Sequence, residues 1–177
     1  MKFRALKADE IDVRVGGVYA KGVTMLLYKN ARVDMQILDE TVGEFNWQRD
    51  HKEVKGNLYC GIGINSGCEW VWKYDCGTES FSDKEKGEAS DAFKRAGFNW
   101  GIGRELYTAP FIWLPCATKP KTNGRGYDVN DPNELKGIYV REIETAETDG
   151  KRVITKLILS QKAQGKVYDI YKWEEKK

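Results

Sequence analysis

The first periodic pattern along the chain is a helical one. Leu27, Ala31, Met35 and Leu38 follow one another at intervals of four, four and three residues, which places them on one side of a helix. Gly43 comes directly after this pattern and is a residue that typically ends a helix. The spacing therefore predicts an amphipathic helix over residues 24–42.

The pattern then changes to an alternation with a period of two. Three segments, 45–54, 57–65 and 68–76, are separated by the turn sequences Lys-Gly-Asn and Asn-Ser-Gly. In the third segment Trp70, Trp72 and Tyr74 alternate with Val71 and Lys73, which a strand produces and a helix does not. These segments predict a three-stranded antiparallel meander.

A helical period returns over residues 82–107, with Ser82 or Asp83 as its amino-terminal cap. Its apolar stripe consists of small and aromatic residues, namely Ala89, Ala92, Phe93, Ala96 and Trp100. Small residues allow a helix to lie close to a sheet. Glycines at positions 97, 101 and 103 are expected to weaken or break its far end.

The remaining chain is irregular at first and strand-like at its end. Prolines at positions 110, 115, 120 and 132 predict an irregular connection, and three short strands are predicted around 138–144, 152–159 and 166–173. The sequence thus predicts an α+β fold, with a helix, a three-stranded antiparallel meander, a second helix and a C-terminal antiparallel β appendage. We expect a domain over 1–115, a connection over 116–136 and the appendage over 137–177.

Composition and charge exclude several classes of protein. The longest apolar runs, such as Phe111 to Leu114, are far shorter than the ~20 residues that cross a bilayer. The charged amino terminus has no apolar region typical of a secretory signal, so we expect a cytoplasmic protein. The net charge is only +2, so any nucleic-acid surface must be a local cluster of cations. Residues 151–177 are the most basic part, with eight basic and three acidic side chains.

The sequence predicts no cofactor and no metal. The four cysteines form no CxxC pair, His51 is the single histidine, and no GxxxxGK[ST] loop for ATP is present. Acidic residues do gather at Asp75, Glu79, Asp83, Glu85 and Glu88, and paired carboxylates can hold Mg²⁺. A solvated loop and helix start is the favoured interpretation, because acidic side chains stabilise a helix amino terminus.

The neighbouring cations Lys94 and Arg95 are the sharpest local feature. They lie off the apolar stripe of the second helix and close to Asp91. Such a pair is usually a solvated helix face with a weak ion pair. Two cations held rigidly on a helix backed by a sheet can also bind successive phosphates, at a small entropic cost.

The segment GEASDAFKRAGFNWGIGRELY resembles the signature helix of the Rad52 superfamily of single-strand annealing proteins, especially small phage or prophage members. ARVDMQILDETVGEFNW resembles the first helix of that family with its Gly and Trp landmarks, and EWVWKYDCGTES resembles the strand before the second helix. The resemblance covers residues 11–110. Family members bind single-stranded DNA, anneal complementary strands without ATP and assemble into rings or helical filaments.

The resemblance implies a DNA-binding groove. Lys94 and Arg95 match the family's basic pair, and Arg32 matches the basic position of its first helix. Phe98 stands where eukaryotic members have a further arginine, so Lys29, Lys86 or Arg104 is expected to supply the missing charge. Phe45 and Tyr28 are candidates for base stacking at the groove edge. Among the other aromatic residues, a core or subunit contact is favoured over base stacking for Trp47, Trp70, Trp72, Tyr74 and Trp100.

We therefore expect an ATP-independent protein, not an enzyme, that binds and anneals single-stranded DNA during homologous recombination and DNA repair. Expected partners are single-stranded DNA, its complementary strand, further copies in a ring or filament, and a host or phage single-strand-binding protein or exonuclease, with no membrane. The alternatives are a protective single-strand-binding protein without annealing activity and a small metal-dependent nuclease.

Overall fold

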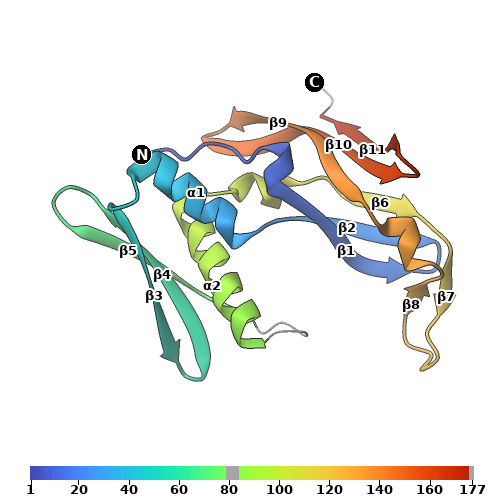
Figure 1. The fold of residues 1–177 in the computed structure, drawn as a ribbon, viewed down its shortest axis with the longest axis horizontal. Helices are drawn as coiled ribbons and strands as arrows, with labels where there is room; N and C mark the ends of the chain where they lie inside the picture. The colour runs from blue at the N-terminus through green and yellow to red at the C-terminus, as the bar shows by residue number, and fades with distance from the viewer. Residues whose placement is uncertain (79–83, 176–177) are drawn as a thin grey trace. The chain divides into compact units, whose positions relative to one another are not determined.

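The computed structural model describes the backbone of residues 1–78 and 84–175, and the side chains of these residues except 84–86. The chain forms two compact units (Figure 1). The helix-sheet unit contains Met1–Leu6 and Lys29–Arg104, and the strand-rich unit contains Lys7–Tyr28 and Glu105–Lys177. The boundaries expected at residues 115 and 136 stay a prediction.

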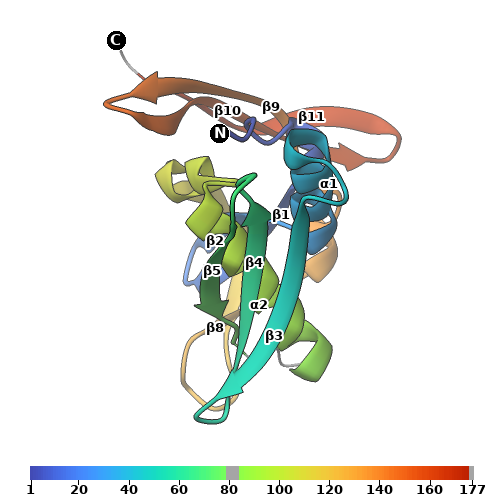
Figure 2. The same cartoon turned by 90° about the vertical axis from the view of Figure 1, so that its left-hand side faces the viewer.

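The helix-sheet unit is built on an antiparallel sheet of three strands. Its strands are β3 (Trp47–Val54), β4 (Asn57–Asn65) and β5 (Trp70–Cys76), with β4 in the centre. The helix α2 (Lys84–Trp100) covers one face of this sheet, and the opposite face is turned towards the viewer in Figure 2. The three predicted strands are present, although β3 and β5 each begin two residues later than expected.

Small side chains bring α2 close to the sheet. Cys60, Ile62 and Ile64 alternate along β4 and are buried under α2, where Ala92, Phe93 and Ala96 are also buried. The Trp100 indole N–H donates to the Ile62 carbonyl oxygen at 2.9 Å, which fixes the end of the helix on the central strand. The predicted apolar stripe of the second helix therefore packs as expected.

The first predicted helix starts too early. Residues 22–29 form the strand β2 (Gly22–Lys29), and the helix α1 (Ala31–Val42) begins only after Asn30. The Asn30 side chain accepts hydrogen bonds from the backbone N–H groups of Arg32 at 2.9 Å and Val33 at 3.3 Å. This side chain caps the helix, so the helix cannot extend back to residue 24.

The strand-rich unit contains three further sheets. One has the order β1-β2-β6, with β1 (Ile11–Tyr19) and β6 (Ile112–Pro115), and β1 was not predicted. A second has the order β11-β10-β9, with β9 (Ile138–Thr148), β10 (Lys151–Ala163) and β11 (Lys166–Glu174). The third pairs β7 (Thr118–Pro120) with β8 (Tyr127–Val129). In the part of the chain that the structure describes, three short 3₁₀ helices complete the elements: η1 (Ala8–Glu10), η2 (Arg104–Thr108) and η3 (Pro132–Leu135).

The α+β class predicted from the sequence is confirmed, with two helices and antiparallel sheets. The second helix ends at Trp100, because Gly101 has a φ of 98°, and η2 follows it as a separate turn. The connection predicted over 116–136 contains β7, β8 and η3. The cap predicted at Ser82 or Asp83 lies outside the described residues.

Candidate nucleic-acid interface

Helix α2 carries Lys94 and Arg95 outside its buried stripe. The adjacent residues Phe93 and Ala96 are buried, whereas the side chains of Lys94 and Arg95 are 23% and 47% exposed. The helical period causes this arrangement. Residues three or four positions apart share one side of a helix, so the two residues between Phe93 and Ala96 point to other sides. Both cations are thus attached to a helix whose position is fixed by its packing.

The Lys94 ammonium lies 3.9 Å from Asp91 Oδ1 on the same helix. Asp91 is itself held by the backbone N–H and the hydroxyl of Thr78, which donate to Oδ2 at 3.1 and 3.0 Å. Burial raises the pKa of the Asp34 carboxyl in α1, and the Lys94 charge opposes this rise. Lys94 therefore lies on the side of α2 that is nearest to α1.

Arg95 lies on the other side of α2, towards β5. Its Nε donates to Asp75 Oδ1 at 3.2 Å, and Asn99 donates to Asp75 Oδ2 at the same distance. Ion pairs at this degree of exposure contribute little to stability, about 0–1 kcal/mol.

Arg32 and Phe45 lie at opposite ends of α1. Arg32 is exposed in the first turn of the helix. Phe45 follows the helix in the loop to β3, and its side chain is 92% exposed. An exposed aromatic ring of this size is available for stacking on another aromatic group.

Lys29 does not lie on the surface, contrary to the expectation that it supplies charge to a groove. Its side chain is 1% exposed, and its ammonium donates to Asp34 Oδ1 and, at 2.7 Å, to the Ile102 carbonyl oxygen. The Phe98 ring centroid lies 4.0 Å from the same nitrogen. Burial is the main cause that raises the pKa of Asp34 to about 6, against the opposite effects of Lys29 and Lys94.

Arg104 is exposed but is engaged with the end of α2. Its Nε donates to the Phe98 carbonyl oxygen at 2.6 Å and its Nη2 to the Asn99 carbonyl oxygen at 2.8 Å. These bonds add a charged donor to two carbonyl groups at the helix end, which also accept from the Gly101 N–H and the Lys73 ammonium. Lys86 belongs to the first turn of α2, and its side chain lies outside the described part of the chain. Tyr28 belongs to the strand-rich unit, where the Arg14 guanidinium lies 4.7 Å from its ring centroid.

Two cations beside α2 were not singled out from the sequence. Arg49 is exposed on β3, with its guanidinium 5.6 Å from the Phe93 ring centroid. Lys73 on β5 donates to the Asn99 carbonyl oxygen at 3.0 Å and lies 4.4 Å from the Trp100 ring centroid. The alternation of β3 and β5 was the available signal, since it places both cations on the face that α2 covers.

The acidic residues considered for a nuclease are used differently where the structure describes them. Asp75 accepts from Arg95 and Asn99, and Glu88 Oε1 accepts from the Leu58 backbone N–H at 3.2 Å. Glu79, Asp83 and Glu85 have no described side chain. Within the described residues, no three His, Cys, Asp or Glu side chains come together as a group able to hold a metal ion.

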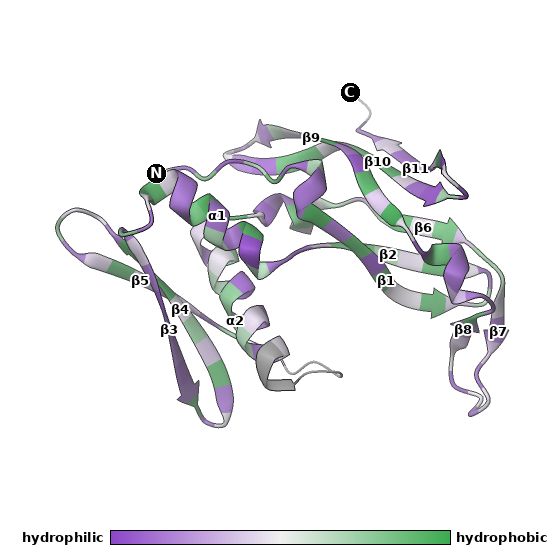
Figure 3. Ribbon diagram, viewed as in Figure 1, coloured by the Kyte–Doolittle hydropathy of each residue, from purple (hydrophilic) through white to green (hydrophobic). Residues whose placement is uncertain are grey.

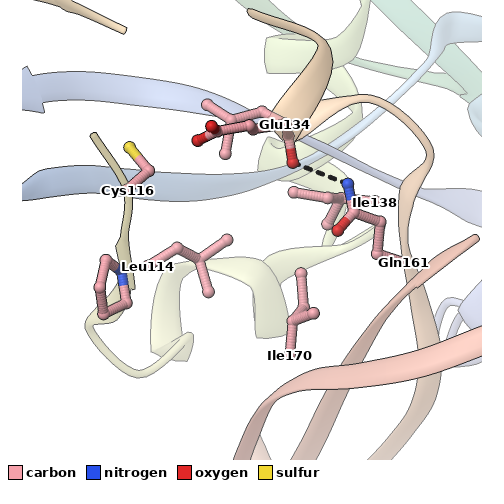
Figure 4. A pocket seen from close by; sticks show the side chains of 8 residues that line it. Leu114, Cys116, Glu134, Ile138, Gln161 and Ile170 are labelled. Atoms are coloured by element: carbon pink, nitrogen blue, oxygen red, sulfur yellow. Dashed lines mark hydrogen bonds between the residues drawn. The ribbon is translucent and has the colours of Figure 1, made fainter. Parts of the chain in front are cut away.

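A pocket of the strand-rich unit contains none of the predicted DNA-binding residues (Figure 4). Gln161 is one of its lining residues and donates from Nε2 to the Glu134 carbonyl oxygen at 2.7 Å. Its lining residues are Leu114, Pro115, Cys116, Glu134, Leu135, Ile138, Gln161 and Ile170.

Neither helix of the described chain is long and apolar enough to cross a membrane.

Comparison with known families gives a match. The family model described as Rad52/22 family double-strand break repair protein matches residues 4–123, which is more than half of the chain. The chain belongs to the Rad52/22 family. The match includes both helices, the sheet of the helix-sheet unit and every predicted DNA-binding residue. Searches of curated proteins and of solved structures gave no significant match. Phage or prophage origin stays a prediction.

Proposed function

We propose that this Rad52/22 family protein binds single-stranded DNA through its phosphates and anneals complementary strands during recombination and repair, without ATP. The observation that carries the proposal is the presentation of Lys94 and Arg95 on a sheet-backed helix, in a chain of this family. Arg32 on α1 is a further proposed phosphate contact, and Phe45 a proposed stacking contact at the edge.

The physics of annealing suits such a surface. Two DNA strands repel each other through their phosphates, and cations that neutralise one strand reduce this repulsion. A protein that holds the backbone leaves the base edges free to find their complements. Pairing then supplies the free energy, about 1.4 kcal/mol per stacked step. No covalent step is needed, so this function requires no catalytic residue.

Lys29 is left out of the proposed interface because its ammonium is buried and bonded. Arg104 is retained as a weaker contact, since its two carbonyl partners are neutral and leave its charge in place. Lys86 is retained on the resemblance alone. Assembly into a ring or helical filament, and contact with a single-strand-binding protein or an exonuclease, are further parts of the proposal.

The central test is the double variant K94A/R95A, measured for single-strand affinity and for annealing of complementary oligonucleotides without ATP. We expect weaker binding to every sequence, together with a salt dependence whose slope falls by about 1.4, because each single-strand phosphate contact contributes about 0.7. Annealing should slow in parallel. The matched control is K119A/K121A, which removes the same charge from the exposed β7–β8 pair in the other unit.

An unchanged affinity of K94A/R95A would contradict the proposed interface. A wild-type protein that binds strands but slows their pairing would instead support the protective single-strand-binding protein. Strand cleavage that appears only with Mg²⁺ and is lost in Asp75→Asn would support the nuclease.

A further inference from the structure

The aromatic residues flagged in the sequence fall on two different faces of the β3-β4-β5 sheet. Trp47 and Trp100 lie on the face that α2 covers, since the Trp47 ring centroid is 6.1 Å from that of Phe93 and Trp100 bonds to Ile62. Trp70, Trp72 and Tyr74 alternate with residues of that face, so they lie on the opposite one. We call these three residues of β5 the aromatic row.

Two rings of the aromatic row lie over Gly61 and Gly63 of β4, which we call the glycine floor. Gly63 is the register partner of Trp72, and Gly61 is the register partner of Tyr74. A Cβ atom added to Gly63 would lie 2.7 Å from the Trp72 ring, and one added to Gly61 would lie 2.3 Å from the Tyr74 ring. Both rings therefore rest on the backbone of β4, which leaves their other faces directed away from the sheet.

The geometry of the rings is that of a flat platform. The ring centroids of Trp72 and Tyr74 are 5.8 Å apart, and the two ring planes differ by only 22°. Trp70 continues the row at the start of β5, with 39% of its surface exposed. In Figure 2 no other described helix or strand of the helix-sheet unit passes in front of this face.

The border of the platform is polar and carries a cation. The neighbouring residues of β3 on this face are Gln48, Asp50 and Lys52, and the strand is mostly hydrophilic in Figure 3. Lys52 Nζ donates to the Tyr74 hydroxyl at 3.0 Å and lies 5.0 Å from the centroid of its ring. Lys52 is thus held at the edge of the platform.

We propose that the aromatic row is a second binding surface, on which unpaired nucleobases of single-stranded DNA stack while Lys52 contacts an adjacent phosphate. This inference rests on the proposed function and adds a surface on the face of the sheet opposite to α2. Every nucleobase has a flat π-face, so rings of this kind bind strands of any sequence. Stacking occupies the faces of the bases and keeps a strand from folding on itself, while their hydrogen-bonding edges stay accessible.

The composition of this face favours bases over a protein partner. Well-packed protein interfaces interlock side chains of both partners. Here the centre consists of flat rings and two glycines, and the described border contributes polar side chains, with Val54 as the one aliphatic residue of β3 on this face. A second copy of the chain is the alternative occupant, and the experiment separates the two.

The experiment compares an ordinary oligonucleotide with an abasic strand of equal length, which keeps the phosphates and lacks the bases. For the variant W72L/Y74L we expect at least about tenfold weaker binding of the ordinary strand, the effect of losing one or two stacked bases. Binding of the abasic strand should not change. W72F, which keeps an aromatic ring at this position, should retain most of the wild-type affinity for the ordinary strand. V54A is the matched control, because Val54 is an exposed apolar residue on the same face.

A second measurement uses the unaltered protein, so that it does not depend on folding of the variant. Strands containing 5-iododeoxyuridine are irradiated with the wild-type protein, and we expect crosslinks within residues 70–74. Crosslinks confined to other segments, or W72L/Y74L binding the ordinary strand like wild type, would overturn the inference. So would a changed oligomer size of W72L/Y74L with unchanged binding, which identifies a second copy as the occupant.

Failure of the proposed function gives a different result. In that case the wild-type protein binds neither strand, and the ordinary and abasic strands are not distinguished. If only the aromatic row is wrongly assigned, K94A/R95A still weakens binding of both strands, whereas W72L/Y74L weakens neither.

Discussion

At the scale of single residues, the buried pair of Lys29 and Asp34 is the most consequential feature outside the proposed interface. Both side chains are almost fully buried, and Asp34 Oδ2 has no hydrogen-bond partner among the described residues. Gly97 approaches so closely that an added Cβ would lie 2.8 Å from Asp34 Oδ1. The pair therefore joins α1 to α2, the two helices that carry Arg32, Lys94 and Arg95.

Removing one member of this pair should cost more than removing both. K29M leaves a buried carboxylate without its cation, and we expect a loss of about 3–5 kcal/mol in the free energy of unfolding. K29M/D34L replaces the pair by apolar side chains and should recover most of that loss. Denaturant unfolding of both variants is the measurement. E40Q, which breaks the exposed pair with Arg4, is the control and should cost less than about 1 kcal/mol. A double variant as unstable as K29M would contradict this account.

The same pair predicts a pH dependence of stability. The pKa of Asp34 is about 6 in the folded protein and has an ordinary value of 3.8, so the folded state binds this proton more tightly than the unfolded chain. Its contribution to stability is fully present below pH 3.8 and is lost as the pH rises through about 6. Between pH 4 and 7 the free energy of unfolding of the wild type should fall, relative to K29M/D34L, by up to about 3 kcal/mol. Parallel pH profiles of the two proteins would show that Asp34 does not titrate in this range.

Residues differ in how far the sequence could predict their place. Lys94 and Arg95 were found because the helical period alone puts them beside a buried stripe. Lys29 was misjudged although Asp34, its ion-pair partner, is only five positions away, because the Ile102 carbonyl oxygen, which also accepts a hydrogen bond from it, lies 73 positions along the chain. No local sequence pattern indicates such a contact, and a lysine is rarely buried without a partner for its charge.

At the scale of elements, the boundary between β2 and α1 shows why the first helix was predicted too long. Leu27 happens to continue the helical spacing of Ala31 and Met35. Val23 and Met25 are buried with a period of two, which is the strand pattern, and the same period leads through the part-buried Leu27 to the buried Lys29. The charge of Lys29 hid this alternation. Asn30, as a helix cap, was the available sign of the true start.

The glycine floor of β4 allows a prediction about that element. In G61A the new methyl group would meet the Tyr74 ring at 2.3 Å, so the ring must move away from the sheet. We expect a loss of about 1–3 kcal/mol in the free energy of unfolding, as for other overpacked sites. G61A/Y74A should lose less than the sum of the single variants, because the second change removes the clash. Additive losses in this double-mutant cycle would indicate that Tyr74 does not rest on Gly61.

At the scale of the whole molecule, the compact units do not follow the order of the chain. Residues 7–28 belong with 105–177, although 29–104 lie between them in sequence. The expected division at residue 115 followed the prolines, which mark turns but carry no information on which distant strands pack together. Within the strand-rich unit β1 contacts β9, and β6 contacts β11. The family match ends at residue 123, before these last strands begin.

This arrangement predicts the behaviour of a chain that stops at residue 115. Such a fragment keeps all of the helix-sheet unit but removes β9 and β11, which contact β1 and β6. We expect amide protons of residues 11–28 to exchange much faster than in the full chain, because an isolated hairpin with one short strand buries too little apolar surface to be stable. Residues 57–65 in β4, held under α2, should keep their protection and serve as the internal control. Native protection of both segments would instead support an independent domain over 1–115, and the C-terminal strands would then be the appendage that the sequence predicted.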